Sequence, residues 1–160
     1  MAAARGAAGA ATPMIGVRIE PHVAKARLDA GEAVALDVTS ALVWPAVNHR
    51  IPGSIRVLPE PVLRALDAAR PAAEIVPHFR GLPADLEVIA YCTCPNEETS
   101  ARIANFLRNH GRQAWALRGG LAAWRTAGFA MEPKAPTPAR VPSADEDCPD
   151  CDQDVAQHRA

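Results

Sequence analysis

Short apolar runs alternate with segments of helical spacing along most of this chain. The predicted strands are 33–37, 54–58, 86–91 and 113–117. The predicted helices are 21–30, 61–69, 71–79, 100–110 and 121–127. Between residues 100 and 110 the large apolar residues Ile103, Phe106 and Leu107 fall on one helical stripe. Strands that alternate with helices predict an α/β fold, in which helices cover both faces of a parallel sheet.

Composition supports one folded domain and excludes two classes of protein. Hydrophobic residues make up 49% of the 160 residues, which is enough for a core. The formal net charge of −1 lacks the basic excess of a nucleic-acid-binding protein. No run approaches the roughly 20 apolar residues that a membrane-spanning helix needs. We therefore expect neither nucleic-acid binding nor a membrane span.

Both ends of the chain have the composition of disordered segments. Residues 1–14 are mostly Ala and Gly without the apolar centre of a secretory signal, so we expect a disordered leader and a cytoplasmic protein. Residues 134–160 contain three prolines before a cluster of acidic residues, and we expect a disordered tail there. The folded domain is then predicted to span residues 15–133.

The four cysteines form two close pairs, Cys92 with Cys94 and Cys148 with Cys151. Such local pairs indicate thiol chemistry or metal binding rather than a disulfide framework. Cys92 and Cys94 lie where a predicted buried strand runs into a helix. Loop amides and the positive end of a helix dipole at such a junction stabilise a thiolate. This junction is the candidate active site, with Cys94 and Cys92 as candidate nucleophiles.

Several motifs around this junction resemble those of the rhodanese-like sulfurtransferases. They are Leu36-Asp-Val-Thr39, His49-Arg-Ile-Pro-Gly-Ser54, Tyr91-Cys92, Ser100-Ala101, and Leu117-Arg-Gly-Gly120 followed by Trp124 and Gly128. The resemblance covers about residues 19–133. It implies a three-layer sandwich with a five-stranded parallel sheet, and a cysteine that carries a sulfane sulfur as a persulfide. It also implies structural roles for Gly119, Gly120 and Trp124, and a supporting role for Asp37 beside the loop.

Spacing within the family pattern favours Cys94 as the nucleophile. Counting from Cys94 places Ser100 and the apolar helix positions without a gap, whereas counting from Cys92 keeps Tyr91 but lengthens the loop by two residues. Cys92 would then be a resolving or protecting thiol. The predicted substrate-binding residues are those of the loop itself: Pro95, Asn96, Glu97, Glu98, Thr99 and Ser100. No cofactor or resident metal is predicted.

The loop departs from the family in its charge. Glu97 and Glu98 stand near the predicted mouth and Thr99 replaces the usual arginine, although Arg102 would partly compensate if it folded back over the loop. Carboxylates repel a doubly negative donor, so thiosulfate is expected to be a poor donor and a persulfide on a small thiol or a protein a better one. The partners are then a sulfur donor and a thiol acceptor.

Two alternative functions remain from the sequence. A phosphatase or arsenate reductase of related fold requires an arginine at the end of the loop, which neither cysteine register provides. A non-catalytic rhodanese-like binding or sensing module is the main alternative. The tail pair, Cys148 and Cys151, has three interpretations: a chance pair, half of a metal site, or a sulfur relay to the active loop.

Overall fold

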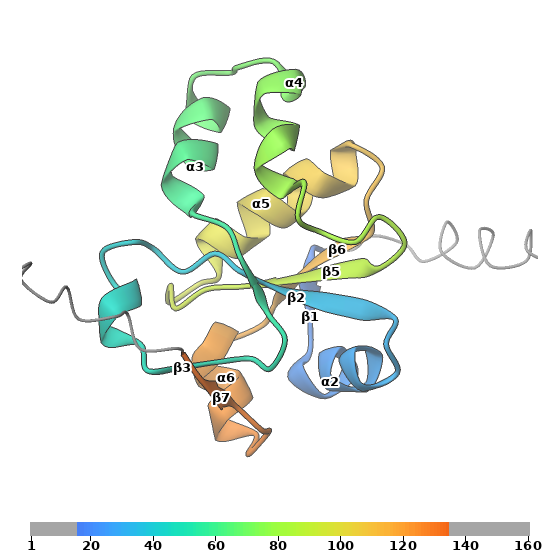
Figure 1. Cartoon of the computed structure of the whole chain (residues 1–160), viewed down its shortest axis with the longest axis vertical. Coiled ribbons are helices and arrows are strands. Elements are labelled where there is room, and N and C mark those ends of the chain that lie inside the picture. Colours follow the sequence, from blue (N-terminus) through green and yellow to red (C-terminus); the bar gives the residue numbers. More distant parts are fainter. Residues whose placement is uncertain (1–15, 135–160) are drawn as a thin grey trace, which may run out of the picture.

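The structure, a computed structural model that describes residues 16–134, is built around a five-stranded parallel sheet with the order β1-β6-β5-β2-β4 (Figure 1). The strands are β1 (Arg18–Ile19), β2 (Ala33–Asp37), β4 (Ile55–Arg56), β5 (Glu87–Tyr91) and β6 (Ala114–Leu117). All neighbouring strands pair in parallel. The predicted α/β class and five-stranded parallel sheet are confirmed.

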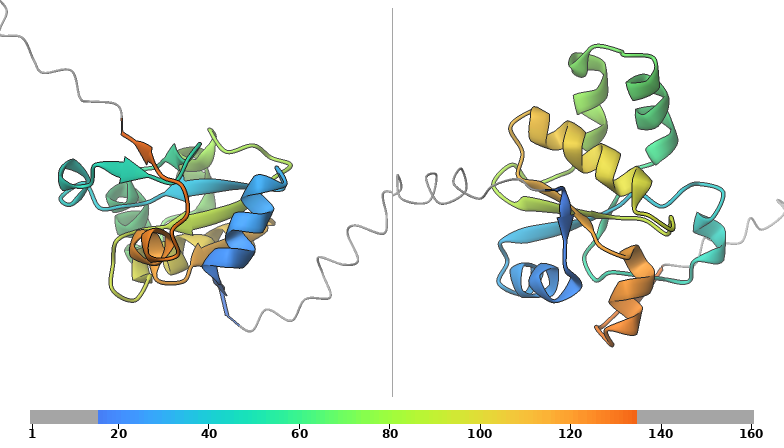
Figure 2. Two further views of the ribbon diagram at one scale, coloured as in Figure 1. Left: turned by 90° about the horizontal axis from the view of Figure 1, so that it is seen from below. Right: turned by 180° about the vertical axis from the view of Figure 1, so that it is seen from behind.

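Helices cover both faces of this sheet (Figures 1 and 2). They are α2 (Pro21–Asp29), α3 (Pro59–Asp67), α4 (Ala72–Ile75), α5 (Glu98–Asn109) and α6 (Gly120–Thr126), with two 3-10 turns, η1 (Trp44–Ala46) and η2 (Val76–Phe79). Helices α3, α4 and α5 lie on one face, and α2 and α6 lie on the other. The layers are therefore those of a three-layer sandwich.

Two hydrophobic cores follow from the alternation of side chains along the central strand. Val88 and Ala90 of β5 point into the core beneath α5, whereas Ile89 and Tyr91 point into the core beneath α2 and α6. Successive residues of a strand face opposite sides of its sheet, so Cys92, which follows β5, belongs to the first core. This alternation places the Cys92 side chain inside the protein.

A second, antiparallel ribbon lies outside the main sheet. It pairs β3 (His49–Arg50) with β7 (Glu132–Pro133). The backbone N–H of Lys134 then donates to the carbonyl of Asn48 over 2.9 Å. Lys134, the first residue of the predicted tail, is thus still attached to the folded domain.

Several element boundaries differ from the sequence-based expectations. The helix expected over 71–79 is split into α4 and η2 because Pro77 cannot continue the hydrogen-bond pattern of an α-helix. The strand expected over 54–58 is only two residues long, and β1, β3 and β7 are too short to show any periodicity in the sequence. The predicted leader and the tail beyond Lys134 lie outside the described residues. Within residues 16–134, no helix is both long and apolar enough to cross a membrane.

Candidate active site

The loop that joins β5 to α5 carries both candidate nucleophiles. This Cys loop, residues 92–97, begins at the carboxyl end of the central strand and ends at Glu97, which precedes the first turn of α5. Glu97 has a φ of 52°, in the left-handed region that few non-glycine residues adopt. Open parallel sheets place their binding sites at this edge. The loop therefore lies where sites occur in this class of fold.

Cys92 is inaccessible in this structure. Its side chain is fully buried, and its Sγ lies 3.6 Å from the Oγ of Ser100. Burial, followed by the contact with the thiol of Cys94, raises the pKa of the Cys92 thiol to about 11. Cys92 is therefore protonated at neutral pH, and the thiol form is not the nucleophile.

Cys94 lies at the surface of the loop instead. Its side chain is half-buried, and its Sγ lies 3.4 Å from the hydroxyl oxygen of Thr99 in the first turn of α5. When Cys94 is a thiolate, only the hydroxyl can donate in this pair. Thr99 thus occupies the position from which it stabilises a charged sulfur at the amino end of the helix.

A cavity of about 900 Å³ opens beside Cys94. We call it the Cys94 cavity. Its walls come from residues 46–49, from residues 93–95 of the Cys loop, from Gly119, Leu121, Ala122 and Arg125, and from Phe129 and Met131. Apolar and polar surface contribute similarly to the lining, in which Arg125 provides a guanidinium and His49 an imidazole. The cavity has room for a molecule much larger than an inorganic anion.

The predicted substrate-binding residues are only partly at this cavity. Pro95 lines it together with Cys94, whereas Asn96 and Glu98 are exposed elsewhere on the loop and helix. Thr99 contacts the Cys94 sulfur. Ser100 is buried behind the loop, where its hydroxyl donates to the carbonyl of Glu97 over 3.1 Å. Residues 95–100 therefore shape the loop more than they line the cavity.

The expectation that Glu97 faces the substrate is wrong. Its carboxylate is buried and accepts two hydrogen bonds, one from Arg18 Nε over 2.8 Å and one from the backbone N–H of Gly119 over 2.6 Å. This carboxylate joins β1, the Cys loop and the turn before α6. Because the Arg18 guanidinium neutralises it, Glu97 does not repel an anionic donor as the sequence suggested.

The expectation that Arg102 folds over the loop is also wrong. Its guanidinium pairs with the carboxylate of Asp67 at the end of α3, over 2.6 Å. Arg102 lies one turn into α5, and its guanidinium is held at the end of α3. The arginine at the cavity is Arg125 of α6.

Comparison with protein families agrees with this geometry. A family model described as the rhodanese-like domain matches residues 20–127, which includes the sheet from β2 onward, the Cys loop and α6. The chain belongs to the rhodanese-like domain family. Comparison with curated proteins finds no match.

Solved rhodanese-like structures share the fold at low sequence identity. The solution structure of a rhodanese-like domain from Anabaena sp. is 26% identical, with a TM-score of 0.52, over 78% of this chain and 86% of that one. A rhodanese-related protein from Thermoplasma volcanium is 18% identical, with a TM-score of 0.51, over 72% and 96%. A thiosulfate sulfurtransferase from Pseudomonas aeruginosa is 20% identical, with a TM-score of 0.50, over 73% of this chain and 19% of that one.

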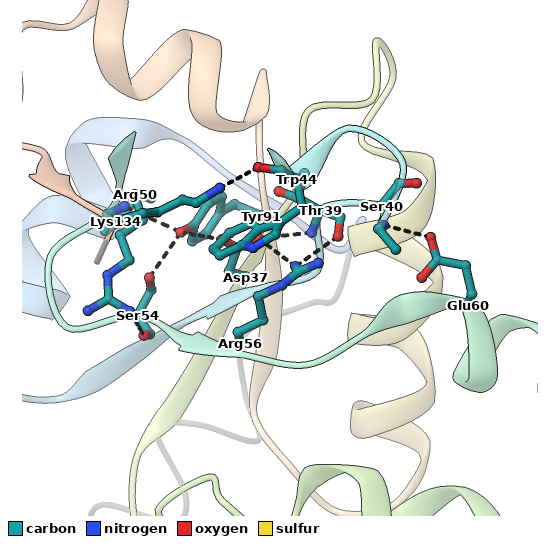
Figure 3. Close-up of polar contacts among 12 residues, drawn as sticks. Asp37, Thr39, Ser40, Trp44, Arg50, Ser54, Arg56, Glu60, Tyr91 and Lys134 are labelled. Atoms are coloured by element: carbon teal, nitrogen blue, oxygen red, sulfur yellow. Dashed lines mark hydrogen bonds and ion pairs between the residues drawn. The ribbon is translucent and has the colours of Figure 1, made fainter. Parts of the chain in front are cut away.

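Asp37 supports this rhodanese-like site from the neighbouring strand end (Figure 3). Its Oδ1 accepts the backbone N–H of Thr39 over 2.9 Å and lies 3.5 Å from the Arg56 guanidinium. Its Oδ2 lies 3.1 Å from the hydroxyl of Tyr91, which is also 3.0 Å from Ser54 Oγ. Burial and the charge of Asp37 raise the pKa of Tyr91 above its usual value. Asp37 therefore braces the strand ends and reaches the Cys loop only through Tyr91.

Trp44 lies between two cations beside this network (Figure 3). The Arg56 guanidinium is 3.9 Å from the centre of its indole ring, and the Lys134 ammonium is 3.7 Å from it. The Lys134 ammonium also donates to the Trp44 carbonyl. Each cation–π contact contributes about 0.5–2 kcal/mol. Trp44 therefore connects the segment before β3 to the end of β7.

The Glu97 ion pair yields a stability prediction. Glu97→Ala is expected to lower the free energy of unfolding by about 2 kcal/mol, because it removes two hydrogen bonds to a carboxylate. Glu98→Ala removes an exposed carboxylate from the next position and is expected to cost less than about 1 kcal/mol. Urea unfolding of both variants compares them directly. Equal losses would show that the Arg18–Glu97 pair does not hold the loop.

Most of the cavity could not be predicted from the sequence. His49, Arg125 and Met131 are far apart in sequence and meet only because the β3–β7 ribbon folds back beside α6. The one available signal was the position of Arg125 beside Trp124, a residue treated as purely structural. Among residues 16–134, no three His, Cys, Asp or Glu side chains are grouped as metal ligands.

Proposed function

We propose that this protein is a sulfurtransferase in which Cys94 carries a sulfane sulfur as a persulfide. The observation that supports this most directly is the contrast between the two thiols of the Cys loop. Cys94 borders a large cavity at the amino end of α5, whereas Cys92 is fully buried and held protonated. Membership of the rhodanese-like family supports the same class of reaction.

The transfer requires two substitutions at sulfur. The Cys94 thiolate attacks the outer sulfur of a donor persulfide, a new S–S bond forms at Cys94, the donor S–S bond breaks, and the donor leaves as a thiolate. A thiolate acceptor then attacks the outer sulfur of the Cys94 persulfide, and Cys94 leaves as a thiolate. The transferred sulfur keeps its proton throughout, so no external oxidant or reductant is needed.

The cavity favours a donor with an organic body. Val47, Leu121 and Phe129 offer apolar surface that thiosulfate cannot use, and about 900 Å³ far exceeds the volume of that anion. Arg125 supplies positive charge for a carboxylate on such a donor. A persulfide carried on a small peptide thiol or on a protein fits these features better than thiosulfate, although the similar Pseudomonas aeruginosa protein is named for thiosulfate.

The proposal is tested by the intact mass of the reduced Cys148→Ser, Cys151→Ser variant, whose only thiols are Cys92 and Cys94, after separate incubations with glutathione persulfide and thiosulfate. We expect a gain of one sulfur atom that cyanide removes, and fragmentation of the loop peptide should place it on Cys94. We expect faster loading with glutathione persulfide.

Three other outcomes have distinct meanings. Faster loading with thiosulfate would overturn the donor assignment but keep the reaction. Sulfur on Cys92 would overturn the choice of nucleophile. No adduct with either donor would overturn the sulfurtransferase and leave a rhodanese-like binding module.

A further inference from the structure

The chain leaves the described structure at the rim of the Cys94 cavity. Met131 lines the cavity, β7 follows directly, and Lys134 is hydrogen-bonded to Asn48, which also lines the cavity. Lys134 is held a second time through its contacts with Trp44. Residues 135–160 therefore start at the rim of the Cys94 cavity.

The second cysteine pair lies within reach of this cavity. Cys148 is fourteen positions beyond Lys134, and Cys151 is seventeen beyond it. A fully extended chain of fourteen residues spans up to roughly 50 Å. That length far exceeds the dimensions of a cavity of about 900 Å³ whose rim Lys134 already borders. The chain length therefore permits either thiol to meet Cys94.

The charges of the tail and of the cavity also favour an approach of Cys148 and Cys151 to Cys94. The cysteine pair stands among acidic residues, at positions 145, 146, 147, 150, 152 and 154. The cavity contains the guanidinium of Arg125, and none of the described residues that line it is acidic. None of the ion pairs among residues 16–134 involves Arg125. An acidic, thiol-bearing segment thus complements the cavity in charge and in chemistry.

We propose that the acidic Cys148–Cys151 segment docks in the Cys94 cavity and accepts the sulfane sulfur of Cys94 within the same chain. This inference rests on the proposed sulfurtransferase function. It assigns the acceptor: a dithiol on the protein itself.

The transfer is balanced in two steps. One thiolate of the pair attacks the outer sulfur of the Cys94 persulfide, so the sulfane sulfur moves to the tail and Cys94 leaves as a thiolate. The second thiolate of the pair attacks the inner sulfur of the new persulfide, forms the Cys148–Cys151 disulfide and expels hydrosulfide. The two tail thiols are oxidised and the sulfane sulfur is reduced, so one turnover needs no other reagent.

A single-turnover experiment on the full chain tests the relay. The reduced protein is loaded with glutathione persulfide and rapidly desalted, and released sulfide and tail disulfide are then measured without added thiol. We expect sulfide and disulfide in equal amounts, at a rate independent of protein concentration. In the double variant Cys148→Ser, Cys151→Ser the Cys94 persulfide should persist roughly 10²-fold longer, because a tethered acceptor has an effective concentration in the millimolar range.

Each alternative result has one meaning. Persulfide that decays equally fast in the double variant overturns the relay and leaves the sulfurtransferase intact. A decay rate that rises with protein concentration makes the transfer intermolecular and overturns the proposal. Tail oxidation that is equally fast in Cys94→Ser shows direct reaction with the donor and also overturns it. Absence of any sulfur on Cys94, in the wild type and the double variant, overturns the proposed function itself.

Docking is tested separately by a matched pair of arginine variants. Arg125→Ala removes the cavity's guanidinium, whereas Arg118→Ala removes an arginine that pairs with Glu20 and does not line the cavity. After loading, sulfide release should slow severalfold in Arg125→Ala at low salt and stay unchanged in Arg118→Ala. Equal rates in both variants would overturn the electrostatic basis of docking.

Discussion

Replacement of Cys94 by serine is expected to lower the rate of sulfur transfer by more than about 10³-fold, as expected when a covalent nucleophile is removed. The hydroxyl of serine keeps the contact with Thr99 but is not ionised at neutral pH, so no persulfide can form. The loop should stay folded, because Cys94 is only half-buried. Transfer from glutathione persulfide to cyanide measures the rate.

Cys92→Ala is the matched variant. It removes the other thiol of the Cys loop from a fully buried position and is expected to lower the free energy of unfolding by about 1 kcal/mol. Transfer should continue, because Cys92 does not line the cavity. If Cys92→Ala lost transfer as completely as Cys94→Ser while remaining folded, the two thiols would act as one unit and the assignment of Cys94 alone would be wrong.

Gly120 lies against the backbone of the Cys loop, and its substitution is expected to destabilise the protein strongly. A Cβ at this position would lie 2.2 Å from the carbonyl oxygen of Cys92, and the backbone has a φ of +57°. The same carbonyl accepts the N–H of Leu121 over 3.1 Å, which holds α6 against the start of the Cys loop. Gly120→Ala must separate these two backbones. We expect a loss of at least about 3 kcal/mol in unfolding free energy, together with loss of persulfide loading.

Gly128→Ala distinguishes the steric clash with Cys92 from the strain of a positive φ as the cause of this loss. Gly128 also has a positive φ, +76°, but an added Cβ meets no atom within 4 Å. It should cost only about 1 kcal/mol, the penalty of the left-handed backbone alone, and should leave loading unchanged. Similar losses in both variants would show that the approach of Gly120 to Cys92 is unimportant. Denaturation midpoints and loading at Cys94 provide the comparison.

The fold was largely predictable because its signals are local. Apolar runs such as Ala33–Asp37 and Glu87–Tyr91 are buried on both faces of a parallel sheet, and helices between them set the connections. The strands that sequence analysis missed, such as β1 and β7, are two residues long and are defined by their partners rather than by their own residues. No periodicity can be read from so few positions.

The contacts of the charged residues at the site were less predictable, because their ion-pair partners are distant in sequence. A carboxylate at position 97 looks exposed in a polar loop, yet Arg18 lies 79 positions earlier and buries it. Arg102 was predicted to reach the loop because it is close in sequence, but its guanidinium pairs with Asp67 on another helix. The buried position of Cys92, in contrast, follows from the two-residue period of β5, which continues past the strand end.

The stacking of Trp44 between two cations gives the protein a built-in optical probe. Trp115 and Trp124 lie in or against the sandwich, whereas Trp44 is held by Arg56 on the strand side and by Lys134 at the end of the β3–β7 ribbon. The electric field at its indole depends on both cations, so its emission is expected to change when the end of the ribbon moves away. Because residues 46–49 and Met131 line the Cys94 cavity, a movement of this wall is expected to change the Trp44 contribution to the fluorescence. Trp124 and Trp115, which itself lies near Arg27 and Arg108, also contribute to that fluorescence, so the measurement uses a variant in which both are replaced by Phe.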